Sequence, residues 1–381
     1  MRTSRTLIAA ALTATSLALI PSAAFATSAN PHGTYPHSTL RGLATEAGIK
    51  FGVAVNMDAL ASDAKYRYLV GTQFSSVTPE NVMKWEVTEP APGVYDFSQG
   101  DALVRFAKEH HQVVRGHNLV WHNQLPTWLT TGSFTPAQLR AILREHVYTE
   151  ARHFRGQIQQ WDVVNEAFND DGTFRQDIWY NAYQQLTGNG SDYIADAFRW
   201  AHEADPHALL FYNDYNLEFT GAKSNAVYSF VQQLQAKHVP INGVGFQGHL
   251  DTQYGYPDLQ NNLQRFANLH LQVAMTEVDV RTFVAQNADG TYSDTPKNPA
   301  DAAKQVDYWT RTLQACLNVK ACKSFTTWGL SDKYSWVPGV FTGEGAALLF
   351  DENNNPKPEY YALIKVLRDY VSHHHGWRAA A

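Results

Sequence analysis

Two short apolar stretches of this sequence each contain a glutamate at their end. Trp161–Phe168 (WDVVNEAF) contains Glu166, and Ala274–Val280 (AMTEVDV) contains Glu277. A carboxylate at the end of a buried strand costs free energy unless it is hydrogen-bonded or has a function. A single glutamate in such a place more often caps a helix or forms a salt bridge. Two of them, however, are the minimum that hydrolysis of a glycosidic bond requires, one as an acid and the other as a nucleophile or base.

Apolar runs with the composition of buried strands predict a β-sheet that could bring the two glutamates together. There are eight of these runs: Phe51–Val55, Phe74–Val77, Val113–Trp121, Ile158–Val164, Leu209–Tyr212, Val244–Phe246, Val273–Met275 and Phe325–Trp328. Segments of helical periodicity lie between and after them: Asp101–His111, Pro136–Phe154, Asp192–Ala204, Lys223–His238, Leu259–His270, Ala300–Leu317 and Glu359–Ser372. The second helix has a clear start signal, because Thr135 suits the N-cap, Pro136 the first helical position, and Gln138 completes a capping box.

This alternation predicts an α/β fold. Buried strands that alternate with amphipathic helices favour a parallel sheet, and eight such units favour closure into a single-domain (β/α)8 barrel, the TIM barrel. A doubly wound open sheet is the competing architecture, but no glycine-rich phosphate loop follows the first strand.

The first residues predict a secretory signal peptide at residues 1–26. Arg2 and Arg5 precede an apolar run from Leu7 to Ile20, and alanines stand at positions 24 and 26, a pattern typical of exported chains. The run is too short for a membrane span, and no later run is long and apolar enough for one. We therefore expect an extracellular protein with a flexible polar leader at 27–38, a (β/α)8 catalytic domain at 39–372 and a solvated C-terminal tail at 373–381.

Composition narrows the class of partner. The formal net charge of −6 argues against nucleic acid or an anionic membrane as a partner. The chain contains 10 tryptophans and 19 tyrosines, whose flat apolar faces suit a sugar-binding cleft, although a large core also uses them. Cys316 and Cys322 are the only cysteines. In an exported protein they are expected to form a disulfide, and without an adjacent histidine they are half a metal-ligand set, so we predict neither a metal nor another cofactor.

Polar and aromatic residues follow the predicted strands at the end where a (β/α)8 barrel places its active site. They are amides, acids, imidazoles and indoles rather than a phosphate-binding cluster of arginine and lysine. His117 alone would more often be a satisfied buried histidine, and Trp85 alone a core aromatic. Their joint occurrence at the ends of successive strands instead favours a site that hydrogen-bonds hydroxyl groups and stacks on sugar rings, and hence an uncharged polysaccharide as the substrate.

The same segments resemble the motifs of family 10 glycoside hydrolases, the retaining endo-β-1,4-xylanases. The matching motifs, in the family's order, are Thr78–Glu86 (TPENVMKWE), Arg115–Gln124 (RGHNLVWHNQ), Trp161–Phe168 (WDVVNEAF), Tyr212–Asn216 (YNDYN), Gly245–Leu250 (GFQGHL), Thr276–Val280 (TEVDV) and Thr327–Trp336 (TWGLSDKYSW). The resemblance spans roughly Leu40 to Leu367, and the short cysteine pair matches a disulfide common in the family. One departure is Asn118, where many members have threonine or alanine.

The resemblance implies a role for each matching residue. Glu166 would be the general acid/base and Glu277 the nucleophile. His249 and Asp279 would keep the nucleophile ionised and oriented, and Asn165 would bind the 2-hydroxyl of the sugar. The substrate-binding residues would be Glu80, Asn81, Lys84, His117, Trp121, Gln124, Tyr215, Gln247, Trp328 and Trp336. The implied partners are xylan and xylo-oligosaccharides, and we expect a monomer.

Two alternatives stay open at this point. An enzyme of the same fold that cleaves β-1,4-glucans or cellobiosides differs only in the space left for C6 of the sugar, which Trp336 and Gln124 would crowd. One added hydroxymethyl group is weakly discriminated by packing. A sugar-binding protein without catalysis would keep the aromatic lining but would not need both Glu166 and Glu277.

Overall fold

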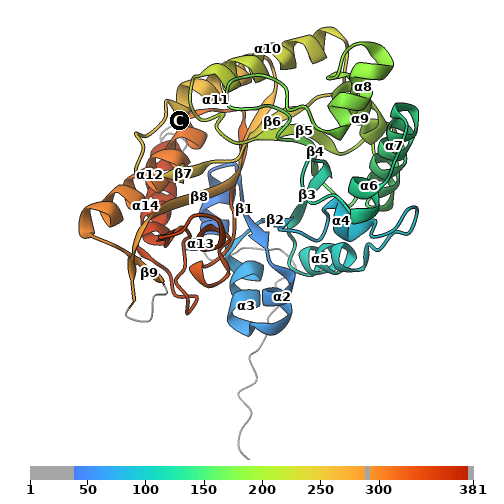
Figure 1. Cartoon of the computed structure of the whole chain (residues 1–381). Helices are drawn as coiled ribbons and strands as arrows, with labels where there is room; N and C mark the ends of the chain where they lie inside the picture. The colour runs from blue at the N-terminus through green and yellow to red at the C-terminus, as the bar shows by residue number, and fades with distance from the viewer. Residues whose placement is uncertain (1–37, 288–291, 376–381) are drawn as a thin grey trace, which may run out of the picture. The chain divides into compact units, whose positions relative to one another are not determined.

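Eight parallel β-strands close into a barrel in the computed structural model, which describes residues 38–287 and 292–375 (Figure 1). The strands of the ring are β1 (Lys50–Val55), β2 (Ser76–Pro79), β3 (Val113–Val120), β4 (Gln160–Asn165), β5 (Leu209–Asp214), β6 (Gly243–Phe246), β8 (Gln272–Gln286) and β10 (Cys322–Thr327). They pair in this order, and the pairing of β10 with both β8 and β1 completes the ring. The predicted (β/α)8 barrel is confirmed. The predicted signal peptide lies outside the described residues.

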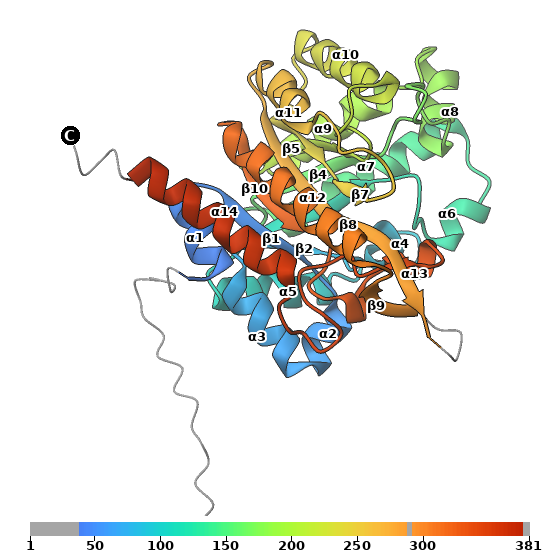
Figure 2. The same ribbon diagram turned by 90° about the vertical axis from the view of Figure 1, so that its left-hand side faces the viewer.

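Helices pack around the strands. They are α1 (Leu40–Glu46), α2 (Met57–Ser62), α3 (Ala64–Gln73), α4 (Trp85–Thr88), α5 (Ser98–Glu109), α6 (Thr127–Thr131), α7 (Pro136–His153), α8 (Ile178–Thr187), α9 (Asp192–Ala204), α10 (Ala222–Ala236), α11 (Leu259–Ala267), α12 (Pro299–Asn318), the 3-10 helix η1 (Asp332–Tyr334), α13 (Val337–Val340) and α14 (Pro358–His375). The short helices α4, α6 and α13 follow the carboxyl ends of their strands and lie on one side of the barrel (Figure 2). This side therefore carries the residues predicted to form the site.

Local sequence explains why the long helices form where they do. At the start of α7 the Thr135 side chain accepts a hydrogen bond from the Gln138 N–H, and Gln138 accepts one from the Thr135 N–H, which confirms the predicted capping box. In α9 the buried residues Ile194, Phe198 and Ala201 recur at helical spacing, so one face of the helix packs on the barrel.

The structure differs from the prediction in three places. The strand predicted at Val273–Met275 is β8, which continues through charged residues to Gln286 and pairs with β7 (His249–Asp251), β9 (Tyr292–Pro296) and β11 (Glu344–Gly345). A search for apolar runs misses this extension, because it contains the charged residues Glu277, Asp279 and Arg281. Each of them lies beside a side chain of opposite charge from another part of the chain. The periodicity made no prediction for the segments that form the helices α1, α2, α3, α4, α6, α8 and α13 and the 3-10 helix η1. The predicted tail at 373–381 begins inside α14, where exposed His373 and His374 form the last turn.

Neither a membrane span nor a metal site emerges from the described residues. None of their helices combines the length and the apolar character needed to cross a membrane. In the same part of the chain no group of three or more histidine, cysteine, aspartate or glutamate side chains is arranged to hold a metal ion.

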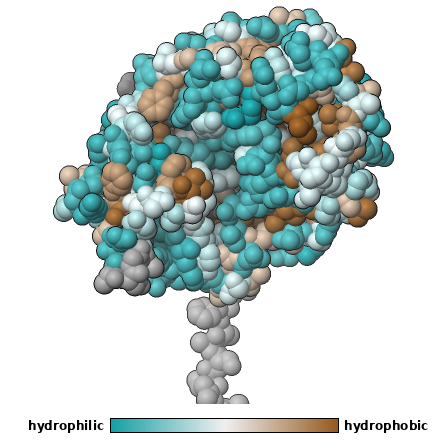
Figure 3. Space-filling view, in the orientation of Figure 1, coloured by the Kyte–Doolittle hydropathy of each residue, from teal (hydrophilic) through white to brown (hydrophobic). Residues whose placement is uncertain are grey.

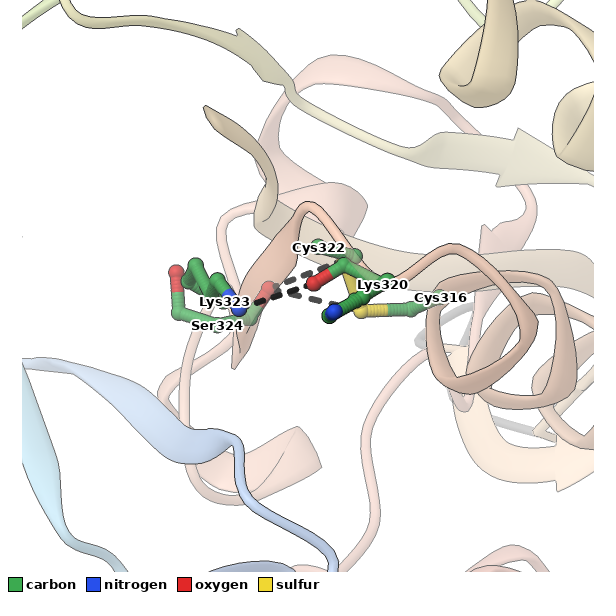
Figure 4. The surroundings of a disulfide bond; sticks show 5 residues. All are labelled: Cys316, Lys320, Cys322, Lys323 and Ser324. Atoms are coloured by element: carbon green, nitrogen blue, oxygen red, sulfur yellow. Dashed lines mark hydrogen bonds between the residues drawn. A yellow bond between two sulfur atoms is a disulfide. The ribbon is translucent and has the colours of Figure 1, made fainter. Parts of the chain in front are cut away.

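The predicted disulfide is present. Cys316, near the end of α12, is bonded to Cys322, the first residue of β10, and both are buried (Figure 4). The Lys323 side chain donates to the carbonyl of Lys320 at 2.8 Å across the same turn. The bond therefore fixes the connection through which the last helix-to-strand unit closes the barrel.

Removing this bond should lower stability by a modest amount. Its loop is only six positions long, and loop-closure entropy for so short a loop corresponds to about 2 kcal/mol. We expect the Cys316→Ala/Cys322→Ala variant to lose about 2 kcal/mol of unfolding free energy in chemical denaturation. The reduced wild-type protein should show the same loss. Two free thiols in the unreduced, denatured wild-type protein would contradict the assignment.

Candidate active site

A central hollow opens at the carboxyl ends of the barrel strands and is lined mostly by hydrophilic residues (Figure 3). Glu166 directly follows β4, and Glu277 lies in β8. Because all eight strands of the ring are parallel, the two glutamates reach the same end of the barrel.

Glu166 is half-buried and is held on both carboxylate oxygens. Its Oε2 accepts a hydrogen bond from Trp121 Nε1 at 2.8 Å, and its Oε1 accepts from Gln247 Nε2 at 2.9 Å and from Asn165 Nδ2 at 3.2 Å. The residue adopts a φ of +58°, uncommon for a side chain other than glycine. Its N–H donates to the Asn213 carbonyl, which helps to fix this conformation.

Glu277 is more deeply buried, with 4% of its surface exposed. Its Oε1 accepts from Asn213 Nδ2 at 2.8 Å and lies 3.9 Å from His117 Nδ1. Its Oε2 lies 3.3 Å from His249 Nε2. Each oxygen of this carboxylate thus faces a side chain from a different strand.

His249 links Glu277 to a second carboxylate. The register between β7 and β8 sets His249 opposite Asp279, and His249 Nδ1 lies 3.0 Å from Asp279 Oδ1. Trp336 Nε1 donates to the other oxygen of Asp279 at 2.8 Å. Burial alone would lower the pKa of His249, but the carboxylates of Asp279 and Glu277 outweigh it and raise the pKa to about 10. His249 is therefore a cation at neutral pH.

A chain of amides joins the two glutamates. Asn165 Oδ1 accepts from Asn213 Nδ2 at 2.9 Å and from Gln247 Nε2 at 3.3 Å. Asn213 bonds Glu277, while Gln247 bonds Glu166. The two carboxylates are therefore positioned by one continuous hydrogen-bonded network.

A match to the model of glycosyl hydrolase family 10 covers residues 39–366. The chain belongs to this family. It is 43% identical over 333 residues to endo-1,4-beta-xylanase B of Thermotoga neapolitana, covering 87% of this chain and 92% of that protein. The crystal structure of native xylanase 10B from Thermotoga maritima superposes with a TM-score of 0.81 at 43% identity, over 88% of this chain and 99% of the other. Xylanase 10B from Thermotoga petrophila in complex with xylobiose gives a TM-score of 0.80 at 43% identity, covering 87% and 98%.

Asn213, in the YNDYN motif of this family 10 member, is a site residue that the sequence did not reveal. Its position depends on Gly245, which faces it across the β5–β6 pairing. A Cβ atom at Gly245 would lie 2.2 Å from Asn213 Oδ1. Gly245, the first glycine of the GFQGHL motif, thus indicates that the Asn213 side chain of the neighbouring strand fills the space where a Cβ atom would lie.

Arg115 and Asp162 form a buried ion pair behind the site and were also not assigned a role. The β3–β4 register sets His117 opposite Asp162, and His117 Nδ1 lies 3.0 Å from Asp162 Oδ2. Arg115 Nε donates to the same oxygen at 3.0 Å and Nη2 to the other. Burial would raise the pKa of Asp162, but Arg115 and His117 outweigh it and lower that pKa. Asp162 thus fixes the His117 ring, whose Nδ1 also lies 3.9 Å from Glu277 Oε1.

The residues predicted to bind sugar on one side of the glutamates form a polar cluster around Lys84. Lys84 Nζ donates to Asn81 Oδ1 at 2.9 Å and to Gln124 Oε1 at 2.6 Å, and lies 5.0 Å from the centre of the Trp121 ring. Burial lowers the pKa of Lys84, although nearby Glu277 and other carboxylates oppose the shift. Burial also raises the pKa of Glu80, which Lys84 opposes. Lys84, Asn81 and Gln124 therefore hold one another in place through their own hydrogen bonds.

Aromatic side chains surround the two glutamates. Trp328 packs edge-on against His117 with 5.0 Å between ring centres, and Trp336 against His249 at 5.0 Å. Arg175 connects Tyr215 to Glu166, because its Nη2 donates to the Tyr215 hydroxyl at 3.2 Å and its Nε donates to the Glu166 carbonyl at 3.1 Å. The structure thus places all the sequence-predicted site residues at this end of the barrel.

The site continues into a cavity of about 480 Å³ beside His249. Its lining includes Lys223, which is buried and pairs with Asp214 at 2.8 Å, and the exposed aromatic rings of Phe219 and Tyr254. Burial, only partly offset by Lys223, raises the pKa of Asp214 to about 7. The cavity therefore combines apolar faces with fixed charges.

The pKa of His249 makes a direct prediction. Because its folded-state pKa of about 10 lies above the ordinary value of 6.5, its charge stabilises the fold fully below about pH 6.5, and this contribution is lost as the pH rises through about 10. In side-chain nitrogen NMR spectra, we expect His249 to stay protonated from pH 5 to 9. Asp279→Asn should lower its pKa by at least about one.

Asp251→Asn is the matched control, since Asp251 pairs with Arg281 at 3.1 Å instead of with His249. It should leave the His249 signal unchanged. A wild-type His249 that titrates near pH 6.5 would contradict the assignment.

Proposed function

We propose that the chain is a secreted endo-1,4-β-xylanase that hydrolyses internal β-1,4 bonds of xylan with retention of configuration. The observation that carries the proposal is the pair Glu166 and Glu277, held at one end of the barrel by a shared amide network. The substrate class is supported by relatives named as endo-1,4-beta-xylanases and by the xylobiose complex of a similar structure. Secretion is supported by the signal-peptide pattern of residues 1–26.

In the first step the ionised Glu277 attacks the anomeric carbon while Glu166 gives its proton to the departing glycosidic oxygen. The carbon–oxygen bond to the leaving sugar breaks, and an ester bond to Glu277 forms. Cationic His249 beside Oε2 holds the carboxylate in place and compensates its charge. Trp121 and Gln247 orient the carboxyl group of Glu166.

In the second step Glu166 takes a proton from water, which attacks the anomeric carbon and releases Glu277. Two inversions give net retention. Asn165 is the proposed partner of the sugar 2-hydroxyl, an interaction that contributes to catalysis insofar as it strengthens in the transition state.

Selection of xylose over glucose is proposed to come from crowding around C6. Gln124 is held by Lys84 and donates to Glu86 Oε1 at 2.8 Å, while Trp336 is held by Asp279. Both side chains are thus fixed and would resist displacement by a hydroxymethyl group.

The substrate class can be tested by initial rates on xylan and on carboxymethylcellulose. We expect xylan to be hydrolysed at least about 10-fold faster, the scale that crowding by one small group can produce. A faster rate on carboxymethylcellulose would favour the glucan-cleaving alternative. No turnover on either polymer, with xylan still bound, would favour a sugar-binding protein.

The two glutamates should respond differently to azide. Glu277→Ala removes the nucleophile and should lower kcat by about 10⁴-fold or more, since no glycosyl-enzyme can form. Azide should restore part of the turnover and yield an α-glycosyl azide. Glu166→Ala removes the acid and should lower the rate on xylan by about 10²–10⁴-fold, while the first step on an aryl glycoside with a good leaving group survives. Azide should then yield the β-glycosyl azide.

The configuration of the azide product, measured by NMR, therefore reports which glutamate is the nucleophile. An α-azide from Glu166→Ala together with a β-azide from Glu277→Ala would mean that the two roles are exchanged.

A further inference from the structure

A buried cluster of three titratable side chains lies behind the site and has no part in the mechanism above. His146 and Glu150, both from α7, have no exposed surface, and Glu89, which follows α4, is 4% exposed. His146 Nδ1 lies 3.2 Å from Glu89 Oε2, and His146 Nε2 lies 3.2 Å from Glu150 Oε2. The imidazole is thus held between two carboxylates.

In this cluster, burial and the contacts between the side chains shift pKa values in opposite directions. Burial lowers the pKa of His146, but Glu150 and Glu89 outweigh it and raise that pKa. Burial also raises the pKa of Glu150, which His146 opposes. A buried ion pair contributes little net stability compared with well-packed apolar residues. A purely stabilising role therefore explains the cluster poorly. Its contacts with the Trp85 ring indicate a role in positioning that side chain.

An aromatic column begins at this cluster. The Trp85 ring lies parallel to the His146 ring, with 3.6 Å between their centres and 6° between their planes. The other neighbour of Trp85 in the stack is Trp179, at 5.0 Å and 8°. Trp85 Nε1 also donates to Glu89 Oε2 at 2.9 Å, so that the indole is fixed by stacking and by a hydrogen bond to the same cluster.

The column reaches the predicted general acid through Trp121. Trp179 Nε1 donates to the Trp121 carbonyl at 3.4 Å, and Trp121 Nε1 donates to Glu166 Oε2 at 2.8 Å. A second route runs through the chain itself, because Lys84 directly precedes Trp85 and its Nζ lies 5.0 Å from the Trp121 ring centre. Both routes end at Trp121, the first at its main-chain carbonyl and the second at its indole ring, which orients Glu166.

We propose that His146 is a positioning residue for the general acid. Held between Glu89 and Glu150, it fixes the Trp85–Trp179 stack, which sets the direction from which the Trp121 N–H meets Glu166. This proposal rests on the proposed function, since it assigns Glu166 the task of protonating the leaving oxygen.

A role in positioning the acid differs from a role in general stability by its dependence on the leaving group. A poor leaving group, the sugar of xylotetraose, needs a well-placed proton, whereas 2,4-dinitrophenolate leaves with little protonation. For both substrates kcat/KM reports the steps up to departure of the leaving group. Loss of acid positioning therefore lowers kcat/KM for xylotetraose far more than for 2,4-dinitrophenyl β-xylobioside, while loss of folded protein lowers both equally.

The experiment compares four proteins on these two substrates. In His146→Gln we expect kcat/KM for xylotetraose to fall by about 10-fold or more, within the range ascribed to acid catalysis, and that for the aryl xylobioside by less than about 3-fold. Trp179→Phe keeps a ring in the column but removes the N–H that reaches Trp121, so it should show the same contrast and decides the matter should His146→Gln fail to fold. Leu363→Ala, a fully buried leucine of α14 remote from α7 (Figure 1), is the control for destabilisation and should show no contrast.

Equal losses on both substrates, or no loss on either, in His146→Gln and Trp179→Phe would overturn the proposal, as would the same contrast in Leu363→Ala. A wild-type protein that hydrolyses neither substrate would instead overturn the proposed function.

Discussion

The two carboxylates at the mouth of the barrel depend on donors that other strands supply. Glu166 follows β4 but is bonded by Trp121, which follows β3, and by Gln247, which follows β6. Glu277 lies in β8 but is bonded by Asn213 from β5 and faces His249 from β7. Burying an ionised carboxylate is costly without such partners, and hydrogen bonds to a charged group are strong only at close range. The geometry of the pair is therefore a property of the closed ring.

At this end of the barrel, His249 and Arg115 each lie beside carboxylates. His249 lies between Glu277 and Asp279, and Arg115 is bonded to Asp162. Each cation compensates a carboxylate that would otherwise be buried alone, and each pair also fixes the orientation of a side chain in the site. Compensation of this kind permits an acidic protein to bury so many acids in its strands.

Much of this arrangement could be predicted from the sequence, because its signals are local. The strands were visible as apolar runs, and the start of α7 was visible from Thr135 and Gln138. The role of Asn213 could not be predicted in the same way, because it depends on which residue of β6 faces it and on the absence of a side chain at Gly245. The extension of β8 could not be predicted from an apolar run, because it contains charged residues. Their partners of opposite charge come from other parts of the chain. The column from His146 to Trp121 likewise joins α7, α4 and α8, whose packing no single segment specifies.

The two sides of the proposed cleft differ in how far they are fixed before substrate binds. On one side Lys84, Asn81 and Gln124 are bonded to one another, so a sugar bound there as proposed would meet a preformed set of donors and acceptors. On the other side the cavity of about 480 Å³ presents the exposed rings of Phe219 and Tyr254. Rigid polar groups discriminate strongly, because a mismatched partner leaves them unsatisfied, whereas apolar faces accept a range of rings. In the proposed mechanism, such an asymmetry would let the enzyme select the sugar that forms the covalent intermediate and accept a varied leaving chain.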